Sequence, residues 1–376
     1  MMILSIDVED YFMVAALSKV VKRADWGRYP LRVEQNTRRV LDILDKAASR
    51  SHAPGASSPL QSATFFCLGW VGERCPALIR EIHSRGHEVA CHGYDHQMIT
   101  AMTPGEFRQD IRKAKAILED ITGRQVVGYR APSYSITRKN LWALEILAEE
   151  GFLYDSSVFP VHHDLYGMPH APRVPFVFSC NGGGTPEFLP LPESIGAPGP
   201  CSSPLSTGAA CNSLPLYSTP PPHCPGACRA PYSPLPQGEG QDEGKAVQHK
   251  SATHPPGPSH TMAARANKPW NLLEFPLSTL RIFGQNIPVA GGGYFRAFPL
   301  WFTRWAQTRT VRQTGSPFIF YLHPWELDPE QPRVKGLSTR SSFRHYLNLH
   351  KTESRLRQFL RGQTITSLRA ALLNRQ

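Results

Sequence analysis

His-Glu-Val-Ala-Cys-His-Gly-Tyr-Asp-His, residues 87–96, is the stretch on which the interpretation of this chain depends. Residues 88–91 are typical of a buried strand, and His92 and His96 follow in a turn that contains a glycine. A neutral imidazole is the commonest protein ligand of zinc-like metals. The two histidines could meet one ion from a single helical turn or from a tight loop. The pair alone is a weak signal, so other parts of the chain must supply a third ligand, a base and an acid.

Apolar strands and amphipathic helices alternate on both sides of this stretch. The spacing of apolar residues predicts strands at 3–6, 63–68, 88–91, 126–129 and 318–322, and helices at 33–48, 76–85, 138–150, 299–313 and 342–360. A further helix begins with the capping pattern Thr103-Pro104-Gly105-Glu106 and ends before Gly123. Such alternation predicts an α/β fold with a parallel sheet and crossover helices.

Polar clusters come directly after several of these strands. Asp7, Glu9 and Asp10 follow the first strand, and Arg130 and His323 follow two later ones. In a barrel of parallel strands these positions lie at the carboxyl end, where active sites are built. A catalytic zinc-type site takes three protein ligands and leaves a position for water. A second carboxylate can then serve as the base, an arginine can keep it ionised, and a histidine can protonate the leaving group.

The composition changes between about residues 180 and 269, where proline, glycine and serine are concentrated and periodicity is lost. Such a stretch cannot bury enough apolar surface to offset the entropy of the chain, so we expect a disordered insertion. The expected organisation is a first barrel segment at 1–179, the insertion at 180–269, a closing barrel segment at 270–330 and a C-terminal helical extension at 331–376.

The formal net charge of +11 would suit an acidic partner, but the basic residues are scattered among acidic ones. The chain has no recognised nucleic-acid motif, so we do not expect nucleic acid as a partner. The apolar N-terminus has no basic region before it, and no run reaches the ~18 apolar residues of a membrane span. We therefore expect a cytoplasmic protein that could associate peripherally with a membrane.

Four segments, in combination and in order, resemble the motifs of the polysaccharide deacetylase (NodB-homology) family, carbohydrate esterase family 4. Residues 5–11 resemble the first motif, usually Thr-Phe-Asp-Asp-Gly, and residues 92–96 the His-x-x-x-His pair; residues 130–132 and 322–323 resemble two further motifs. The resemblance covers residues 1–180 and 270–330, approximately. The opening Asp-Val-Glu-Asp-Tyr-Phe at 7–12 and the stretch 294–349 resemble a subgroup associated with exopolysaccharide gene clusters of the exosortase (PEP-CTERM) type.

The resemblance implies a distorted (β/α) barrel of the NodB-homology type, interrupted by the long insertion. It also implies metal-dependent removal of N-acetyl (or O-acetyl) groups from an amino-sugar glycan or its precursor in exopolysaccharide biosynthesis. The expected partner is an N-acetylated polysaccharide or oligosaccharide, and the expected cofactor is a divalent metal, with Zn²⁺ as the first choice. Carried over by position, the metal ligands are Asp10, His92 and His96, while Arg130 tunes the base and His323 is the acid.

The base has two candidates. A straight alignment with the family motif selects Glu9. Asp7 points to the same side of a regular strand, and its shorter side chain keeps the carboxylate near the backbone, which slightly favours it. Both assignments stay open on the sequence alone.

Other side chains near these motifs could contact a sugar, and packing in the core or at the rim is an equally good interpretation of them. These candidates are Tyr134, Trp325, Tyr294 and Arg296. Glu326 could hold His323 in one tautomer. Two other functions stay open: a catalytically silent glycan-binding scaffold, and a related C–N hydrolase that acts on a small cyclic amide.

Overall fold

The computed structural model describes residues 1–49, 61–163, 166–181, 186–191 and 269–373. A ten-stranded sheet runs in the order β11-β1-β2-β3-β4-β5-β8-β6-β7, and β12 also pairs with β1. Its strands are β1 (Met2–Val8), β2 (Thr64–Cys67), β3 (Glu88–Cys91), β4 (Gly128–Tyr129), β5 (Tyr154–Asp155), β6 (Phe176–Cys180), β7 (Glu187–Pro190), β8 (Trp270–Glu274), β11 (Phe318–Leu322) and β12 (Ile365–Thr366). The strands from β11 to β8 are parallel, and β6 and β7 are antiparallel to their neighbours. The predicted α/β class with a parallel sheet is confirmed.

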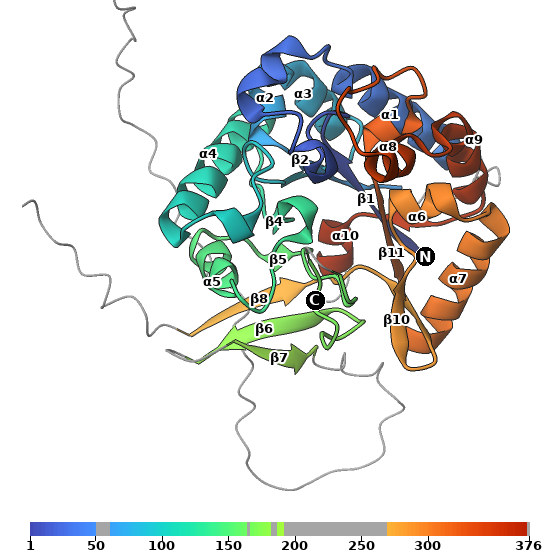
Figure 1. Cartoon of the computed structure of the whole chain (residues 1–376). Coiled ribbons are helices and arrows are strands. Elements are labelled where there is room, and N and C mark those ends of the chain that lie inside the picture. Colours follow the sequence, from blue (N-terminus) through green and yellow to red (C-terminus); the bar gives the residue numbers. More distant parts are fainter. Residues whose placement is uncertain (50–60, 164–165, 182–185, 192–268, 374–376) are drawn as a thin grey trace, which may run out of the picture. The chain divides into compact units, whose positions relative to one another are not determined.

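Helices connect the parallel strands and surround them (Figure 1). They are α1 (Val33–Ser49), α2 (Gly69–Arg74), α3 (Pro76–Ser84), α4 (Pro104–Thr122), α5 (Trp142–Glu149), α6 (Gly292–Ala297), α7 (Leu300–Thr314), α8 (Thr339–Tyr346), α9 (Leu349–Phe359) and α10 (Leu368–Leu373). A separate hairpin, β9 (Thr279–Ile282) and β10 (Gln285–Pro288), precedes α6. The start of α4 is as the sequence predicts, because Thr103 and Glu106 form a capping box and Gly123 ends the helix with a left-handed backbone.

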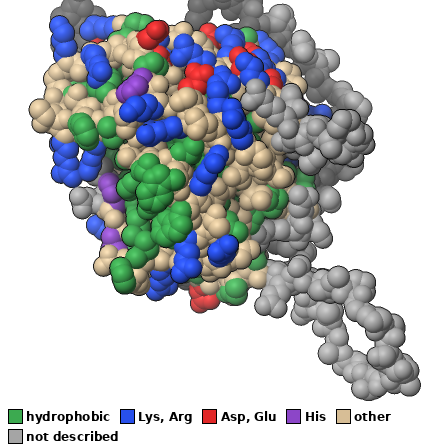
Figure 2. All heavy atoms as spheres, turned by 90° about the vertical axis from the view of Figure 1, so that its right-hand side faces the viewer, with side chains coloured by type: hydrophobic (Ala, Val, Ile, Leu, Met, Phe, Trp, Pro, Cys, Tyr) green, Lys and Arg blue, Asp and Glu red, His purple; other side chains and the backbone are tan. Residues whose placement is uncertain are grey.

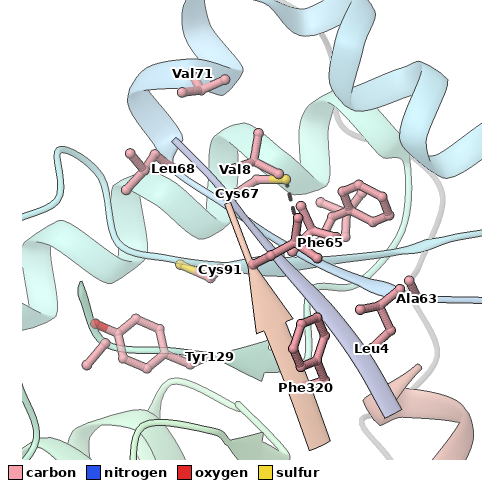
Figure 3. Close-up of a cluster of buried hydrophobic side chains, with 14 of the residues drawn as sticks. Leu4, Val8, Ala63, Phe65, Cys67, Leu68, Val71, Cys91, Tyr129 and Phe320 are labelled. Atoms are coloured by element: carbon pink, nitrogen blue, oxygen red, sulfur yellow. Dashed lines mark hydrogen bonds between the residues drawn. The ribbon is translucent and has the colours of Figure 1, made fainter. Parts of the chain in front are cut away.

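The two faces of the sheet carry separate apolar cores. In β1, Leu4 and Val8 belong to the larger core, together with Phe65 from β2 and Phe320 from β11 (Figure 3). Ile3 belongs to the smaller core on the other face. Because successive residues of a strand point to opposite faces, the parity of a residue in β1 decides its surroundings. Odd-numbered residues of β1 face the smaller core, which we call the inner face.

Strand β1 is paired along both edges. Residues Met2–Ile6 pair with β11, Ser5–Val8 pair with β2, and Met2 and Ile3 pair with β12 beyond the end of β2. The C-terminal segment expected as a helical extension therefore also adds a strand to the sheet. The single helix expected at 342–360 is two helices, α8 and α9, because Asn348 has a left-handed backbone with φ +53°.

One other expectation needs adjustment. Cys180 and β7 lie inside the range 180–269 that was expected to be an insertion, and both belong to the sheet through β6 and β7. The rest of that expectation, over residues 192–268, lies outside the described residues.

The stability of this fold should fall in acid through His87, which is buried between β2 and α3. Burial lowers the pKa of His87 from its ordinary value of 6.5 to about 4, and Nδ1 accepts a hydrogen bond from the N–H of Ala63. The unfolded chain takes up a proton near pH 6.5 and the folded chain only near pH 4. The contribution of His87 is therefore complete above pH 6.5, and up to about 3 kcal/mol of it is lost as the pH falls to 4.

Replacing His87 by Asn keeps an acceptor for Ala63 and removes the titrating group. Urea unfolding of the His87→Asn variant between pH 7 and 4 should therefore show a smaller loss of unfolding free energy than the unmodified chain. Parallel curves for the two proteins over this range would contradict the assignment.

Candidate active site

Three potential metal ligands meet where β1 and β3 end. Ligand atoms of Glu9, His92 and His96 all lie within 4.8 Å of one another, and the three side chains are buried. Glu9 directly follows β1, and His92 directly follows β3. Two imidazole nitrogens and one carboxylate oxygen form a donor set that suits Zn²⁺ or a similar divalent cation.

The ring of His92 is held in the orientation and tautomer that a metal needs. Its Nδ1 lies 2.8 Å from the backbone carbonyl oxygen of Arg130. Because a carbonyl can only accept, Nδ1 must carry the proton, and Nε2 keeps its lone pair for the site. Burial lowers the pKa of His92 to about 4, so the ring is neutral at pH 7.

The loop from His92 to His96 is fixed by helix α4. Gly93 has φ +77° and His96 has φ +59°, so two of its residues have left-handed backbones. The carboxylate of Asp110 accepts a hydrogen bond of 3.0 Å from the N–H of Tyr94. A Cβ atom at Gly93 would lie 2.9 Å from that carboxylate, so the glycine permits this close approach. These contacts bring His96 back toward His92.

Glu9 lies between two histidines. Its Oε2 is 2.7 Å from Nε2 of His96, and its Oε1 is 3.2 Å from Nε2 of His323. Burial would raise the pKa of Glu9, but the charges of His96 and His323 outweigh burial and lower it to about 2. Oε2 is buried without an aligned hydrogen bond, although His96 is so near. An oxygen and a nitrogen that face each other in this way fit two ligands of one cation.

Asp10, expected as a ligand, is turned away from this cluster. Its carboxylate accepts hydrogen bonds from the backbone N–H groups of Tyr11, Arg32 and Val33, at 2.8, 2.6 and 2.9 Å. It therefore caps the start of α1 on the outer side of the sheet. Asp10 follows the end of β1 at Val8, where the N–H of Glu9 bonds the carbonyl of Asp7 and the chain turns. In this structure Glu9, and not the expected Asp10, lies beside His92 and His96.

Asp7 is held on the inner face by Arg130. Nη1 of Arg130 donates to Oδ1 of Asp7 at 2.7 Å, and the hydroxyl of Tyr134 lies 3.4 Å from Oδ2. Arg130 is fully buried, and it also donates to the hydroxyl of Ser5 and to the side chain and backbone of Ser156. A buried guanidinium without a carboxylate partner is costly, so the pairing with Asp7 balances the buried charge of Arg130.

His323 lies across the site from Asp7. Its Nε2 is 4.0 Å from Oδ2 of Asp7, and its Nδ1 is 2.7 Å from Oε1 of Glu326. Burial opposes the charged ring, but Glu9 and Glu326 outweigh it and raise the pKa of His323 to about 9. Glu326 is held in turn by Arg296, whose Nε donates to Oε2 at 2.6 Å. His323 therefore carries a proton at neutral pH, and its Nε2 faces the cluster.

The four candidate sugar contacts have different surroundings. Arg296 is buried and its remaining donors bind backbone carbonyls of α8 and the residues after it, so it supports Glu326 and is not available to a sugar. Trp325 is buried between the rings of His323 and His345, with Nε1 3.5 Å from Glu9. Tyr134 is buried beside Asp7, and Tyr294 is half-buried in α6. The sequence did not point to Asp110 or Ser156, whose supporting roles depend on contacts between distant segments.

Comparison with known proteins assigns part of the chain. A family model described as Polysaccharide deacetylase matches residues 59–150. Residues 59–150 are therefore similar to polysaccharide deacetylases. A second model, Domain of unknown function (DUF3473), matches residues 245–373. The first match contains His92, His96 and Arg130, and the second contains His323 and Glu326, so the candidate site is assembled from both regions and from β1.

Curated relatives match the same domain. The chain is 32% identical over 128 residues to the peptidoglycan deacetylase-like protein of Gibberella zeae, covering 34% of each chain. It is 33% identical over 112 residues to the peptidoglycan deacetylase of Helicobacter pylori, covering 30% of this chain and 36% of that one. The chain thus spans about a third of the length of these relatives. Among solved structures, a family 4 carbohydrate esterase from Streptomyces lividans aligns with 41% of this chain and 60% of its own, at 19% identity and a TM-score of 0.30.

Replacing Glu9 or Asp10 by the corresponding amide should distinguish the roles of these two neighbouring carboxylates. Glu9→Gln should weaken Zn²⁺ binding about 100-fold or more, because it removes a charged ligand atom from the cluster. Asp10→Asn, the matched change one residue later, should keep Zn²⁺ binding and lower only the unfolding free energy, by about 1 kcal/mol through the weakened cap of α1. Isothermal titration with Zn²⁺ and urea unfolding measure the two effects. Loss of Zn²⁺ binding in Asp10→Asn with normal binding in Glu9→Gln would reverse the assignment.

Proposed function

We propose that this chain is a metal-dependent hydrolase that removes N-acetyl (or O-acetyl) groups from an amino-sugar glycan or its precursor. The observation that carries the proposal is the convergence of Glu9, His92 and His96 beside Asp7 and His323. The matched relatives are named as peptidoglycan deacetylases, which supports an N-acetylated glycan as the substrate class.

Glu9, His92 and His96 would hold a divalent cation, with Zn²⁺ as the first choice for this donor set. When bound, such an ion polarises a carbonyl oxygen and lowers the pKa of a water molecule to about 7. The buried cluster offers three protein ligands, the number typical of catalytic sites that keep a position for water.

Asp7 is the proposed general base. Arg130 binds Oδ1 and holds the carboxylate in place, so that Oδ2 can take a proton from the attacking water. Oδ2 is the oxygen that faces His323, at 4.0 Å from Nε2. This arrangement favours Asp7 over Glu9, whose oxygens are directed to the histidines of the cluster.

His323 is the proposed general acid. Glu326 accepts from Nδ1–H, which leaves the proton on Nε2 directed at the site. That proton can pass to the departing sugar amine, while Glu326 and Arg296 keep the ring in place. Acetate and a free amino sugar are the products.

We further propose a role in exopolysaccharide synthesis on the cytoplasmic side. The support is the resemblance of residues 7–12 and 294–349 to the subgroup associated with such gene clusters.

Acetate release from N-acetylglucosamine oligomers tests the activity directly. The unmodified chain loaded with Zn²⁺ should release acetate, and a chelator should abolish the release. Asp7→Asn should lower kcat about 100- to 10,000-fold while Zn²⁺ stays bound, because the base is lost and the three ligand atoms of the cluster remain. Asp25→Asn, a matched change of an exposed carboxylate, should leave kcat unchanged. A metal-loaded chain that releases no acetate from any N-acetylated oligosaccharide would instead support the silent scaffold.

The partner of His323 gives a second test. Glu326→Gln should lower kcat about 10- to 100-fold with Zn²⁺ affinity and KM unchanged, because the ring loses its anionic partner but keeps an acceptor. Glu330→Gln, a matched change at an exposed position four residues later, should have no effect. A Glu326→Gln enzyme as fast as the unmodified one would exclude this role for Glu326.

A further inference from the structure

One segment of the chain carries positive charge without any compensating acid. Residues 275–325 contain no aspartate or glutamate. Arg281, Arg304, Arg309 and Arg312 in this segment are exposed, and none of them forms an ion pair within the described parts of the chain. Some exposed arginines elsewhere, such as Arg112 with Glu150, do form ion pairs. The exposed charges of this segment are therefore all positive.

The same segment exposes aromatic side chains. Trp301 is 70% exposed, Trp305 is 46% exposed, and Phe283 is fully exposed at the tip of the β9–β10 hairpin. Trp301 and Trp305 are one helical turn apart in α7, and Phe302 contacts both rings. Figure 2 looks onto the side where α7 and β10 lie in Figure 1, and it shows hydrophobic side chains gathered among Lys and Arg. Exposed apolar groups that cluster in this way mark an interaction surface.

The β9–β10 hairpin is held against helix α7 by hydrogen bonds. The side chain of Gln313 in α7 bonds both the N–H and the carbonyl of Arg281 in β9, and the hydroxyl of Thr310 lies 3.4 Å from the carbonyl of Thr279. Phe283 is therefore presented at the end of a strand pair that is hydrogen-bonded to α7. We call Phe283, Trp301 and Trp305, with the four arginines, the α7 surface.

We propose that the α7 surface docks on a lipid bilayer that carries anionic headgroups. Tryptophan places an apolar body and a polar N–H at the boundary between acyl chains and water, and a phenylalanine at a hairpin tip can enter the acyl region. Arginines near the bilayer are attracted by anionic lipids, and the absence of acidic residues in the segment removes the opposing repulsion. Among the described helices, none has the length and hydropathy to cross a membrane, so docking would be peripheral.

The α7 surface belongs to the same segment of the chain as part of the candidate site. Helix α6 ends shortly before α7, and its first residue, Gly292, approaches the carboxylate of Glu326 so closely that a Cβ atom there would overlap it. The α7 surface and the His323–Glu326 pair are thus parts of one continuous segment. This docking does not depend on the proposed deacetylation, and its test does not use activity.

Co-sedimentation of the full chain with vesicles tests the proposal. The chain should bind vesicles of phosphatidylcholine with a minor share of phosphatidylglycerol, bind pure phosphatidylcholine vesicles more weakly, and lose binding as salt rises. Trp301→Ala with Trp305→Ala should lower the partition coefficient at least about tenfold. Arg304→Gln with Arg309→Gln should lower it about 25-fold, since each arginine contributes a factor of about five.

Matched changes elsewhere serve as controls. Leu189→Ala removes an exposed apolar side chain from β7, and Arg80→Gln removes an exposed charge from α3, and neither should change the partition coefficient. Circular dichroism establishes that each variant is folded. Negligible binding of the unmodified chain to anionic vesicles, or equal binding by the unmodified chain and both double variants, would overturn the proposal.

Discussion

The buried guanidinium of Arg130 is the constraint on which the rest of the site depends. A fully buried arginine is tolerated only when its donors are satisfied and its charge is balanced. Asp7 balances the charge, and Ser5 and Ser156 take the other donors, so β1 and β5 are tied to β4 at their carboxyl ends. The backbone carbonyl of the same residue fixes the tautomer of His92. Arg130 thus positions both the candidate base, Asp7, and a candidate metal ligand, His92.

The order of strands and motifs explains what the sequence could predict about the site. His92, Arg130 and His323 follow strands whose ends meet at one edge, so their convergence was predictable. Asp7 lies within β1, but Glu9 and Asp10 lie beyond its end at Val8. There the N–H of Glu9 bonds the carbonyl of Asp7, and the carboxylate of Asp10 caps α1. The directions of these two side chains depend on this turn, which a match to a motif with two adjacent aspartates does not reveal.

Other features depend on contacts that a linear sequence does not contain. The strand β12 fills the edge of β1 beyond the end of β2, and only the paired register reveals that it is needed there. Arginine is a residue type that often contacts substrates. Arg296 is nevertheless buried against Glu326, because α6 packs close to the segment that follows β11. The region matched as a domain of unknown function supplies β11 and His323, so it contributes both to the sheet and to the candidate site.

Anomalous diffraction at the zinc absorption edge, from crystals of the full chain grown with Zn²⁺, tests the central claim most directly. The account predicts one strong peak about 2.0–2.2 Å from a carboxylate oxygen of Glu9 and from Nε2 of both His92 and His96, with Asp10 still bonded to the start of α1. A peak bound by Asp10, or a Zn²⁺-saturated crystal without a peak between Glu9 and the two histidines, would contradict it.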